Sequence, residues 1–128
     1  INRLKQKLKS GLVNSIWIQF GTDYKLLKNR IELLSNILSS TLKKNSNISN
    51  IMLFGSILIP SSQFLTRFKY RPWKGVYCSS EFLGSVEVAN NVITKLLKTY
   101  KEYNILPVVE NIISTEEHLI RLKMIFNL

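Results

Sequence analysis

Apolar residues follow two patterns along this chain, and the two patterns alternate. Continuous apolar runs are typical of parallel strands that are buried on both faces, whereas apolar residues three and four positions apart form one face of a helix. Three long runs and one short run therefore predict strands. The predicted strands cover residues 12–20, 48–59, 75–78 and 105–113.

Helical spacing predicts five helices between and around these strands. Gly11 and Asn104 are suited to the C-terminal end of a helix, and Thr22 or Asp23 can cap the helix that follows. Residues 114–117, Ser-Thr-Glu-Glu, match a capping box. The predicted helices are the segment before Gly11, the helix after Asp23, residues 63–68, residues 85–103 as the longest, and a terminal helix opened by the capping box. The clearest predicted loop is the polar segment 43–47.

Strands that alternate with helices predict parallel β/α units. A complete (β/α)8 barrel typically takes about 250 residues, so four strands and five helices in a chain of 128 residues amount to about half a barrel. We therefore expect one α/β segment, residues 1–128, that is part of a larger TIM barrel. The open strand edges of a half barrel invite pairing, either with a second copy or with the missing barrel half. The remaining alternative is a small open-sheet α/β domain.

Composition narrows the class of protein further. With 45% hydrophobic residues the chain is expected to be globular, and no apolar run approaches the roughly 20 residues that cross a bilayer. We therefore expect no membrane partner. The single cysteine, Cys78, cannot form an internal disulfide, and the amino terminus lacks the apolar core of a signal peptide; both favour the cytoplasm or an organellar matrix. The net charge of +10 favours a polyanionic partner.

Two motifs carry a resemblance to a known family. Residues 5–11 (KQKLKSG), a strand that ends at Gln19, and Asp23 at a helix start together resemble the "K-x-x-A-G … TQ-x-x-x-D" pattern of the methylenetetrahydrofolate reductase family. Residues 54–62 (FGSILIPSS) are similar to that family's "PG-I-x-P-x-S" strand and turn, and residues 71–73 and 105–109 match it less specifically. The chain departs from the pattern by one extra residue before Gln19, by Ile18 in place of Thr, and by the missing closing His-x-Tyr-x-x-Asn.

The resemblance implies the carboxyl-terminal half of a TIM-barrel flavoenzyme of one-carbon metabolism and methionine biosynthesis. In that family FAD passes a hydride to a folate one-carbon unit, and the catalytic glutamate and most flavin contacts would lie before Ile1. The resemblance also implies that Gln19 binds the folate substrate through its pterin ring and that Lys7 lies near the flavin phosphates. From the residues alone, Gln19 can instead satisfy loop backbone groups, Lys7 belongs to a solvated helix face, and Asp23 is a helix cap.

Residues 67–74 (RFKYRPWK) interleave four cations with three aromatic residues. Arg67, Lys69, Arg71 and Lys74 are therefore possible anion-binding residues. In a barrel loop the aromatic rings would pack inward while the cations face an anionic cofactor or a polyglutamate tail. In a nucleic-acid binder the rings would stack on bases. The alternative function is accordingly a non-catalytic basic α/β module that binds RNA or a partner complex.

Other chemistry finds little support in the sequence. Glu110 lies near the end of the last predicted strand, the correct edge for an acid in a barrel. Apart from Asp23 no other carboxylate is so placed, so the sequence predicts no paired-carboxylate chemistry. His118 and Cys78 lack the companions that a metal site or an activated nucleophile requires. Ser56 follows Gly55 without forming the G-x-S-x-G elbow. Catalytic residues therefore remain unassigned.

Overall fold

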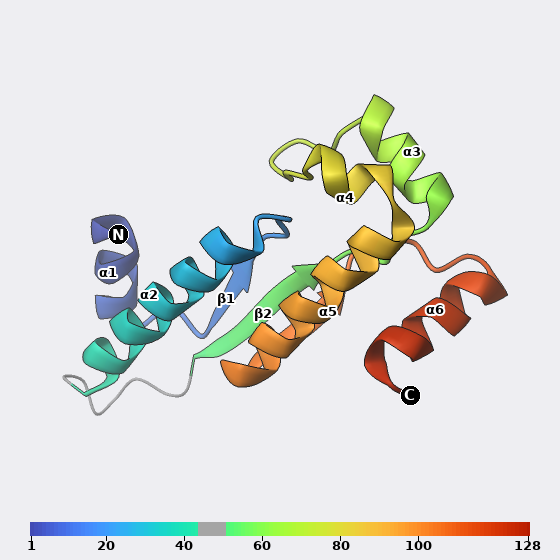
Figure 1. Ribbon diagram of the computed structural model, residues 1–128. Coiled ribbons are helices and arrows are strands. Elements are labelled where there is room, and N and C mark those ends of the chain that lie inside the picture. The colour runs from blue at the N-terminus through green and yellow to red at the C-terminus, as the bar shows by residue number, and fades with distance from the viewer. Residues whose placement is uncertain (44–50) are drawn as a thin grey trace.

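The computed structural model describes residues 1–43 and 51–128, which form a mixed α/β fold (Figure 1). Residues 44–50, which include most of the predicted loop 43–47 and the start of the predicted strand 48–59, lie outside the described part. Six helices and three strands are found in the described residues. In chain order they are α1 (Asn2–Lys9), β1 (Ser15–Ile18), α2 (Tyr24–Leu42), β2 (Met52–Ile57), α3 (Ser62–Tyr70), α4 (Ser80–Gly84), α5 (Val86–Glu102), β3 (Ile105–Val109) and α6 (Glu116–Phe126).

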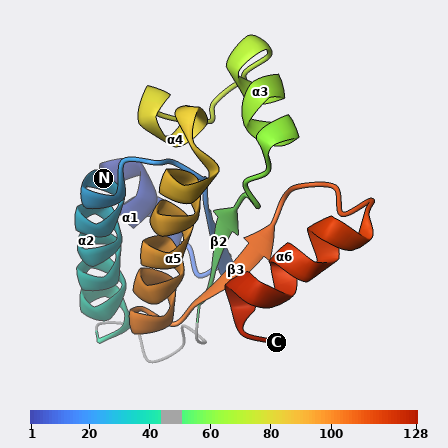
Figure 2. The same ribbon diagram turned by 45° about the vertical axis from the view of Figure 1, so that its right-hand side comes forward.

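The three strands form one parallel sheet in the order β1-β2-β3, the same as their order along the chain. The ladder pairs Trp17 with Phe54 and Phe54 with Leu106, so these three residues share one layer and one face. The prediction of parallel β/α units is confirmed for these strands. Because all three run in one direction, their carboxyl ends meet at a single edge, and α3 and α4 lie beyond that edge (Figure 2).

The helices cover one face of the sheet. Ile31 of α2 and Tyr100 of α5 are buried in one cluster with Ile57 and Ile105 of the strands, and Phe126 of α6 packs against the same cluster. Figure 1 shows α2 and α5 side by side across the strands. A second cluster lies between the carboxyl edge and helices α3 to α5, and a third joins α1 to α2. The core therefore comprises the layer between the sheet and α2 and α5, a larger cluster at the carboxyl edge, and a smaller one between α1 and α2.

Several predicted helix ends are confirmed. The carboxylate of Asp23 accepts a hydrogen bond of 3.0 Å from the backbone N–H of Leu26, which caps α2. Gly11 and Asn104 adopt left-handed φ angles of 72° and 53° just beyond α1 and α5, as helix-terminating residues do. Helix α6 begins as predicted, but its cap is Thr115.

Other predicted bounds were wrong. Strands β1 and β3 are shorter than the apolar runs that predicted them, because an apolar residue continues a strand only while a neighbour pairs with it. Leu12 is 86% exposed and precedes the ladder. Residues 75–78 contribute only an isolated bridge between Tyr77 and Gly21, and not a strand. Helix α2, with 19 residues, is longer than α5 with 17, and α4 was not predicted.

Candidate functional site

Three side chains from the three strand segments form a hydrogen-bonded chain at the carboxyl edge of the sheet. The indole N–H of Trp17 donates to the hydroxyl of Ser56 at 2.6 Å, and that hydroxyl donates to Oε1 of Glu110 at 2.6 Å. The backbone N–H of Glu110 donates to the carbonyl of Ile57, which holds the start of the loop after β3 against β2. Trp17 and Glu110 are thus brought to one hydroxyl although 93 positions separate them.

This chain of hydrogen bonds lies on the face of the sheet opposite α2 and α5. Alternation along the strands puts Trp17, Phe54 and Leu106 on that face, where Trp17 and Leu106 are 54% and 53% exposed. The rings of Trp17 and Phe54 stack with their centroids 5.9 Å apart. Within the described residues the sheet therefore has one face buried by helices and one apolar face that is largely open, with its polar groups gathered at the carboxyl edge.

Gln19, predicted to bind substrate, lies at this edge. Its neighbours Ile18 and Phe20 pack into the clusters on the helical side, so its exposed side chain faces the open side with Trp17. Continuing the pairing of Ile18 with Gly55 by one residue places Gln19 beside Ser56. No hydrogen bond of its amide to any described residue is found, so the alternative that Gln19 satisfies loop backbone groups has no support here.

Lys7, predicted to bind a cofactor, lies elsewhere. It is exposed in the last turn of α1, and α1 leads into the amino-terminal end of β1. Gln19 follows the opposite end of the same strand. The structure therefore does not bring Lys7 together with Gln19 or Glu110.

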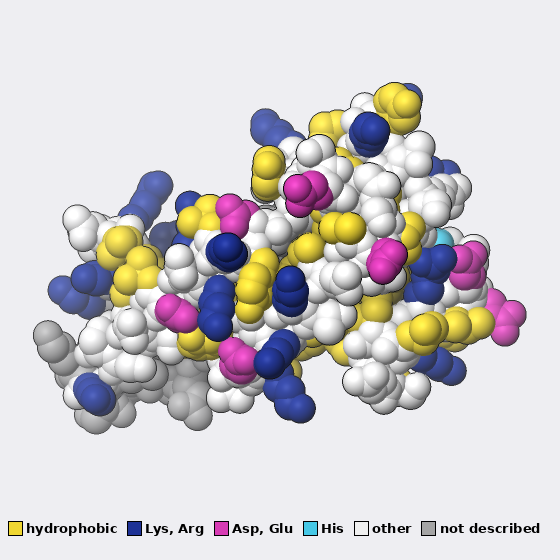
Figure 3. All heavy atoms as spheres, viewed as in Figure 1, with side chains coloured by type: hydrophobic (Ala, Val, Ile, Leu, Met, Phe, Trp, Pro, Cys, Tyr) yellow, Lys and Arg dark blue, Asp and Glu magenta, His cyan; other side chains and the backbone are white. Residues whose placement is uncertain are grey.

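A cavity of about 750 Å³ opens beside the same edge, between α3 and the segment that runs from β3 into α6. Two of the four predicted anion-binding residues, Arg67 and Arg71, line it, whereas Lys69 and Lys74 do not. All four are exposed. The visible face in Figure 3 carries its Lys and Arg side chains dispersed over several elements, so that view shows no single basic patch.

Aromatic residues form one wall of this cavity. Trp73 packs edge-on against Phe64 with centroids 5.7 Å apart and lies 6.0 Å from the ring of Phe68, which is buried. The expectation that the aromatic rings of this segment pack inward holds for Phe68, whereas Trp73 contacts Phe64 and Phe68 but remains 41% exposed. The expectation fails for Tyr70, which is 79% exposed, because the turn of α3 that buries Phe68 points Tyr70 outward.

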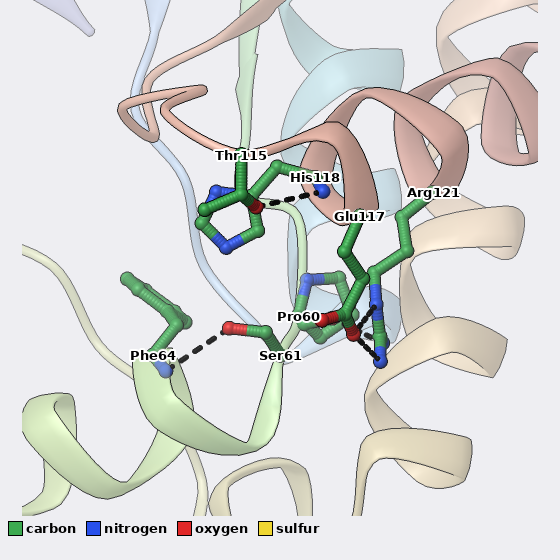
Figure 4. A network of polar contacts seen from close by, with 7 residues as sticks. All are labelled: Pro60, Ser61, Phe64, Thr115, Glu117, His118 and Arg121. Atoms are coloured by element: carbon green, nitrogen blue, oxygen red, sulfur yellow. Dashed lines mark hydrogen bonds and ion pairs between the residues drawn. The ribbon is translucent and has the colours of Figure 1, made fainter.

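The opposite wall is the beginning of α6 (Figure 4). The backbone N–H of His118 donates to the hydroxyl of Thr115 at 3.2 Å, while its ring atom Nδ1 is buried without a hydrogen-bond partner among the described residues. Arg121 pairs with Glu117 at 2.7 Å and donates to the carbonyl of Pro60 at 3.2 Å. The contact of Arg121 with Pro60 holds α6 against the segment that follows β2, beside the cavity.

Two features of the edge were missed by sequence reasoning. The side-chain amide of Asn111 makes two hydrogen bonds to the backbone of Ile59: its oxygen accepts from the N–H of Ile59, and its nitrogen donates to the carbonyl of Ile59. These hydrogen bonds join the segments that follow β2 and β3. Ser56, dismissed as a nucleophile, is fully buried as the centre of the hydrogen-bonded chain. The sequence did contain a signal for Ser56. It lies in one predicted strand and Glu110 lies near the end of another, so parallel pairing of the two strands could bring them together.

Burial raises the pKa of two side chains next to the core, Cys78 and Tyr100. It raises the pKa of the Cys78 thiol to about 11, which argues against a thiolate nucleophile at neutral pH. Burial, and secondly the charge of Glu110, raises the pKa of Tyr100. Tyr100 therefore stays a neutral phenol, and its hydroxyl donates to the carbonyl of Ser56 at 3.0 Å.

Comparison of this chain with protein-family models, with curated proteins and with solved structures finds no match in any of the three. Among the helices of the described residues, none combines the length and the apolar character needed to cross a membrane.

Proposed function

We propose that this chain is a segment of a methylenetetrahydrofolate-reductase-like flavoenzyme and forms the carboxyl-terminal half of a (β/α)8 barrel. The observation that carries the proposal is the sheet itself: three parallel strands in chain order, with α2 and α5 on one face. A doubly wound sheet reverses its strand order and has helices on both faces. A barrel keeps the order and places every helix outside.

The distribution of polar residues supports the same proposal. The open face carries Phe54 and Leu106 near its middle and Trp17, Ser56, Gln19 and Glu110 at its carboxyl edge. Barrel enzymes place packed apolar layers inside and their active sites at that edge. Under this proposal Gln19 binds the pterin ring of a folate, and Arg67 and Arg71 in the cavity bind the anionic end of the ligand or cofactor.

The chemical step belongs to the flavin, FAD by resemblance to the family. The residues of this chain bind and orient the folate substrate and supply electrostatics, while most FAD contacts come from the missing barrel half. The exposed position of Lys7 in α1 adds nothing to the proposal.

Gln19→Ala in the complete protein tests the substrate assignment. We expect folate affinity to fall by about 1–3 kcal/mol, the cost of leaving polar partners unmet, with the melting temperature little changed because the amide is exposed. Gln6→Ala, at an exposed position of α1, is the matched control and should bind folate normally. Unchanged affinity in Gln19→Ala, or a purified complete protein without flavin absorbance, would contradict the proposal.

One observation favours the alternative of a basic RNA-binding module. Tyr70 is exposed between the exposed cations Lys69 and Arg71, an arrangement suited to stacking on a base. That function requires RNA affinity that falls steeply with salt and a loss of about 1–3 kcal/mol in Tyr70→Ala. We expect weak, unsaturable RNA binding at physiological salt, because the ring of Trp73 already packs against Phe64 and Phe68. A fluorescence titration with RNA measures this binding.

A further inference from the structure

Glu110 is held in one orientation by the hydroxyl of Ser56. An indole N–H can only donate, so the hydroxyl of Ser56 accepts from Trp17 and has its single proton left for Glu110. Oε1 of Glu110 therefore accepts, as an ionised carboxylate does. Because Ser56 is fully buried, this hydroxyl has no competing water and fixes the carboxylate against the edge of the sheet.

The carboxylate of Glu110 keeps most of its hydrogen-bonding capacity. A carboxylate has about four acceptor positions, and the contact with Ser56 uses one of them. In the part of the chain that the structure describes, no Lys or Arg forms an ion pair with Glu110, and its side chain is half-buried. In a chain with a net charge of +10, this is a fixed negative charge with no cation assigned to it.

A flat apolar surface adjoins the carboxylate. The indole of Trp17 is 54% exposed and is supported by the ring of Phe54. Its nitrogen is bonded to the same hydroxyl as Glu110, so the ring and the carboxylate lie within the span of one small molecule. An exposed indole face attracts planar rings and cations.

We propose that Trp17, Ser56 and Glu110 form a binding site for a planar ligand with an amidine-type edge, that is, two adjacent N–H donors on a ring or an amidinium cation. The ring lies against Trp17, and the two N–H groups donate one to each carboxylate oxygen of Glu110, that is, to Oε2 and to the acceptor position that Ser56 leaves free on Oε1. These are the two parallel bonds of a bidentate pair. Ser56 is a positioning residue that orients Glu110. The identity of the natural ring rests on the proposed function: a 2-amino-4-oxo pterin has this edge.

The geometry also separates this ligand class from two others. A divalent cation needs more oxygen ligands than one carboxylate supplies, and no group of three metal-ligating side chains is found among the described residues. An anion is repelled by Glu110 and would favour Arg67 and Arg71 in the neighbouring cavity. The negative charge of Glu110 and the acceptor role of its oxygens therefore both favour a ligand that donates hydrogen bonds.

Benzamidine, with benzamide and benzoate as matched planar probes, tests this assignment in the 128-residue chain. The titration follows Trp fluorescence in a Trp73→Phe background, so that Trp17 is the only indole. We expect saturable quenching by benzamidine, with benzamide weaker and benzoate without effect. Glu110→Gln keeps an oxygen to accept from Ser56 and so preserves the fold, but should weaken benzamidine about tenfold and remove its advantage over benzamide.

Glu102→Gln is the control, because Glu102 is exposed at the far end of α5; it should bind benzamidine like the parent. Equal quenching by all three probes, no saturable quenching, or unchanged benzamidine affinity in Glu110→Gln would overturn the assignment. None of these probes is a folate or a flavin. A negative result therefore refutes this site, whereas the proposed function is decided separately by the Gln19→Ala and flavin measurements.

Discussion

Gly55→Ala should destabilise the protein markedly although it adds a single methyl group. A Cβ at Gly55 would lie 2.5 Å from the Cε2 and Cζ atoms of Tyr100 and 2.9 Å from Cγ2 of Ile105. Carbon atoms pack best about 3.5–4.0 Å apart, so the ring must retreat by about 1 Å. Tyr100 is fully buried, and a packed core resists such movement at a cost of about 1–3 kcal/mol.

Two smaller effects modify that figure. Moving the ring stretches the hydrogen bond of the Tyr100 hydroxyl to the carbonyl of Ser56, currently 3.0 Å, which is worth about 1 kcal/mol. Replacing glycine within a strand recovers about 0.5–1 kcal/mol of backbone entropy. The two nearly cancel, and the expected net loss in the free energy of unfolding is about 2 kcal/mol.

Urea denaturation followed by circular dichroism measures this loss. Gly84→Ala is the matched control, because its would-be Cβ meets no atom within 4 Å apart from its chain neighbours and the backbone of its own helix. Gly84 lies in α4, where alanine is the better helix former, so the substitution should be neutral or stabilising. In a Tyr100→Leu background, which lacks the two ring carbons, Gly55→Ala should lose most of its cost. An equal cost in both backgrounds, or no cost in the parent, would refute the packing of Tyr100 on Gly55.

Three further outcomes are expected. Burial raises the pKa of the Cys78 thiol from 9.0 to about 11, so between these pH values the thiol stays protonated in the folded chain and ionises in the unfolded chain. The free energy of unfolding should therefore keep its full value below pH 9 and fall as the pH rises toward 11. Thiolate absorbance of the folded chain should appear near pH 11. Asn111→Asp should cost about 1–3 kcal/mol in urea melts by placing a carboxylate against the carbonyl of Ile59. Asp23→Ala should lower the free energy of unfolding by about 0.5–2 kcal/mol through loss of the α2 cap, whereas Asp23→Asn should keep it.

The class and order of most elements were predictable because their ends rest on short-range chemistry, whereas α4 and the absence of a strand at residues 75–78 were not predicted. Asp23, Gly11 and Asn104 mark helix ends through their own backbone or side-chain preferences, and these need no tertiary contact. Strand lengths depend instead on a partner. The apolar run at residues 12–20 indicates that this segment is at least partly buried. Which of its residues form the strand depends on pairing with β2, which includes Ser15–Ile18 and leaves Phe20 beyond the strand, buried in the cluster at the carboxyl edge.

The candidate site was predictable only in part for the same reason. Gln19 and Glu110 were placed correctly at strand ends because the carboxyl edge follows from parallel topology. Trp17 and Ser56 were not recognised, since nothing local distinguishes a tryptophan on an open face from one in a core. Their roles follow from register: Trp17 pairs with Phe54, two positions before Ser56, and so reaches the hydroxyl beside Glu110.

The open face of the sheet connects the fold to the proposed function. Parallel sheets are normally covered on both faces, and an apolar face with Met52 and Leu106 each about half exposed is energetically unfavourable in water. Complete burial of that face would be the simplest remedy, yet its carboxyl edge carries Ser56, Gln19 and Glu110, which need polar partners. A barrel interior meets both requirements, because further strands bury the apolar middle while the carboxyl edge stays open to a ligand.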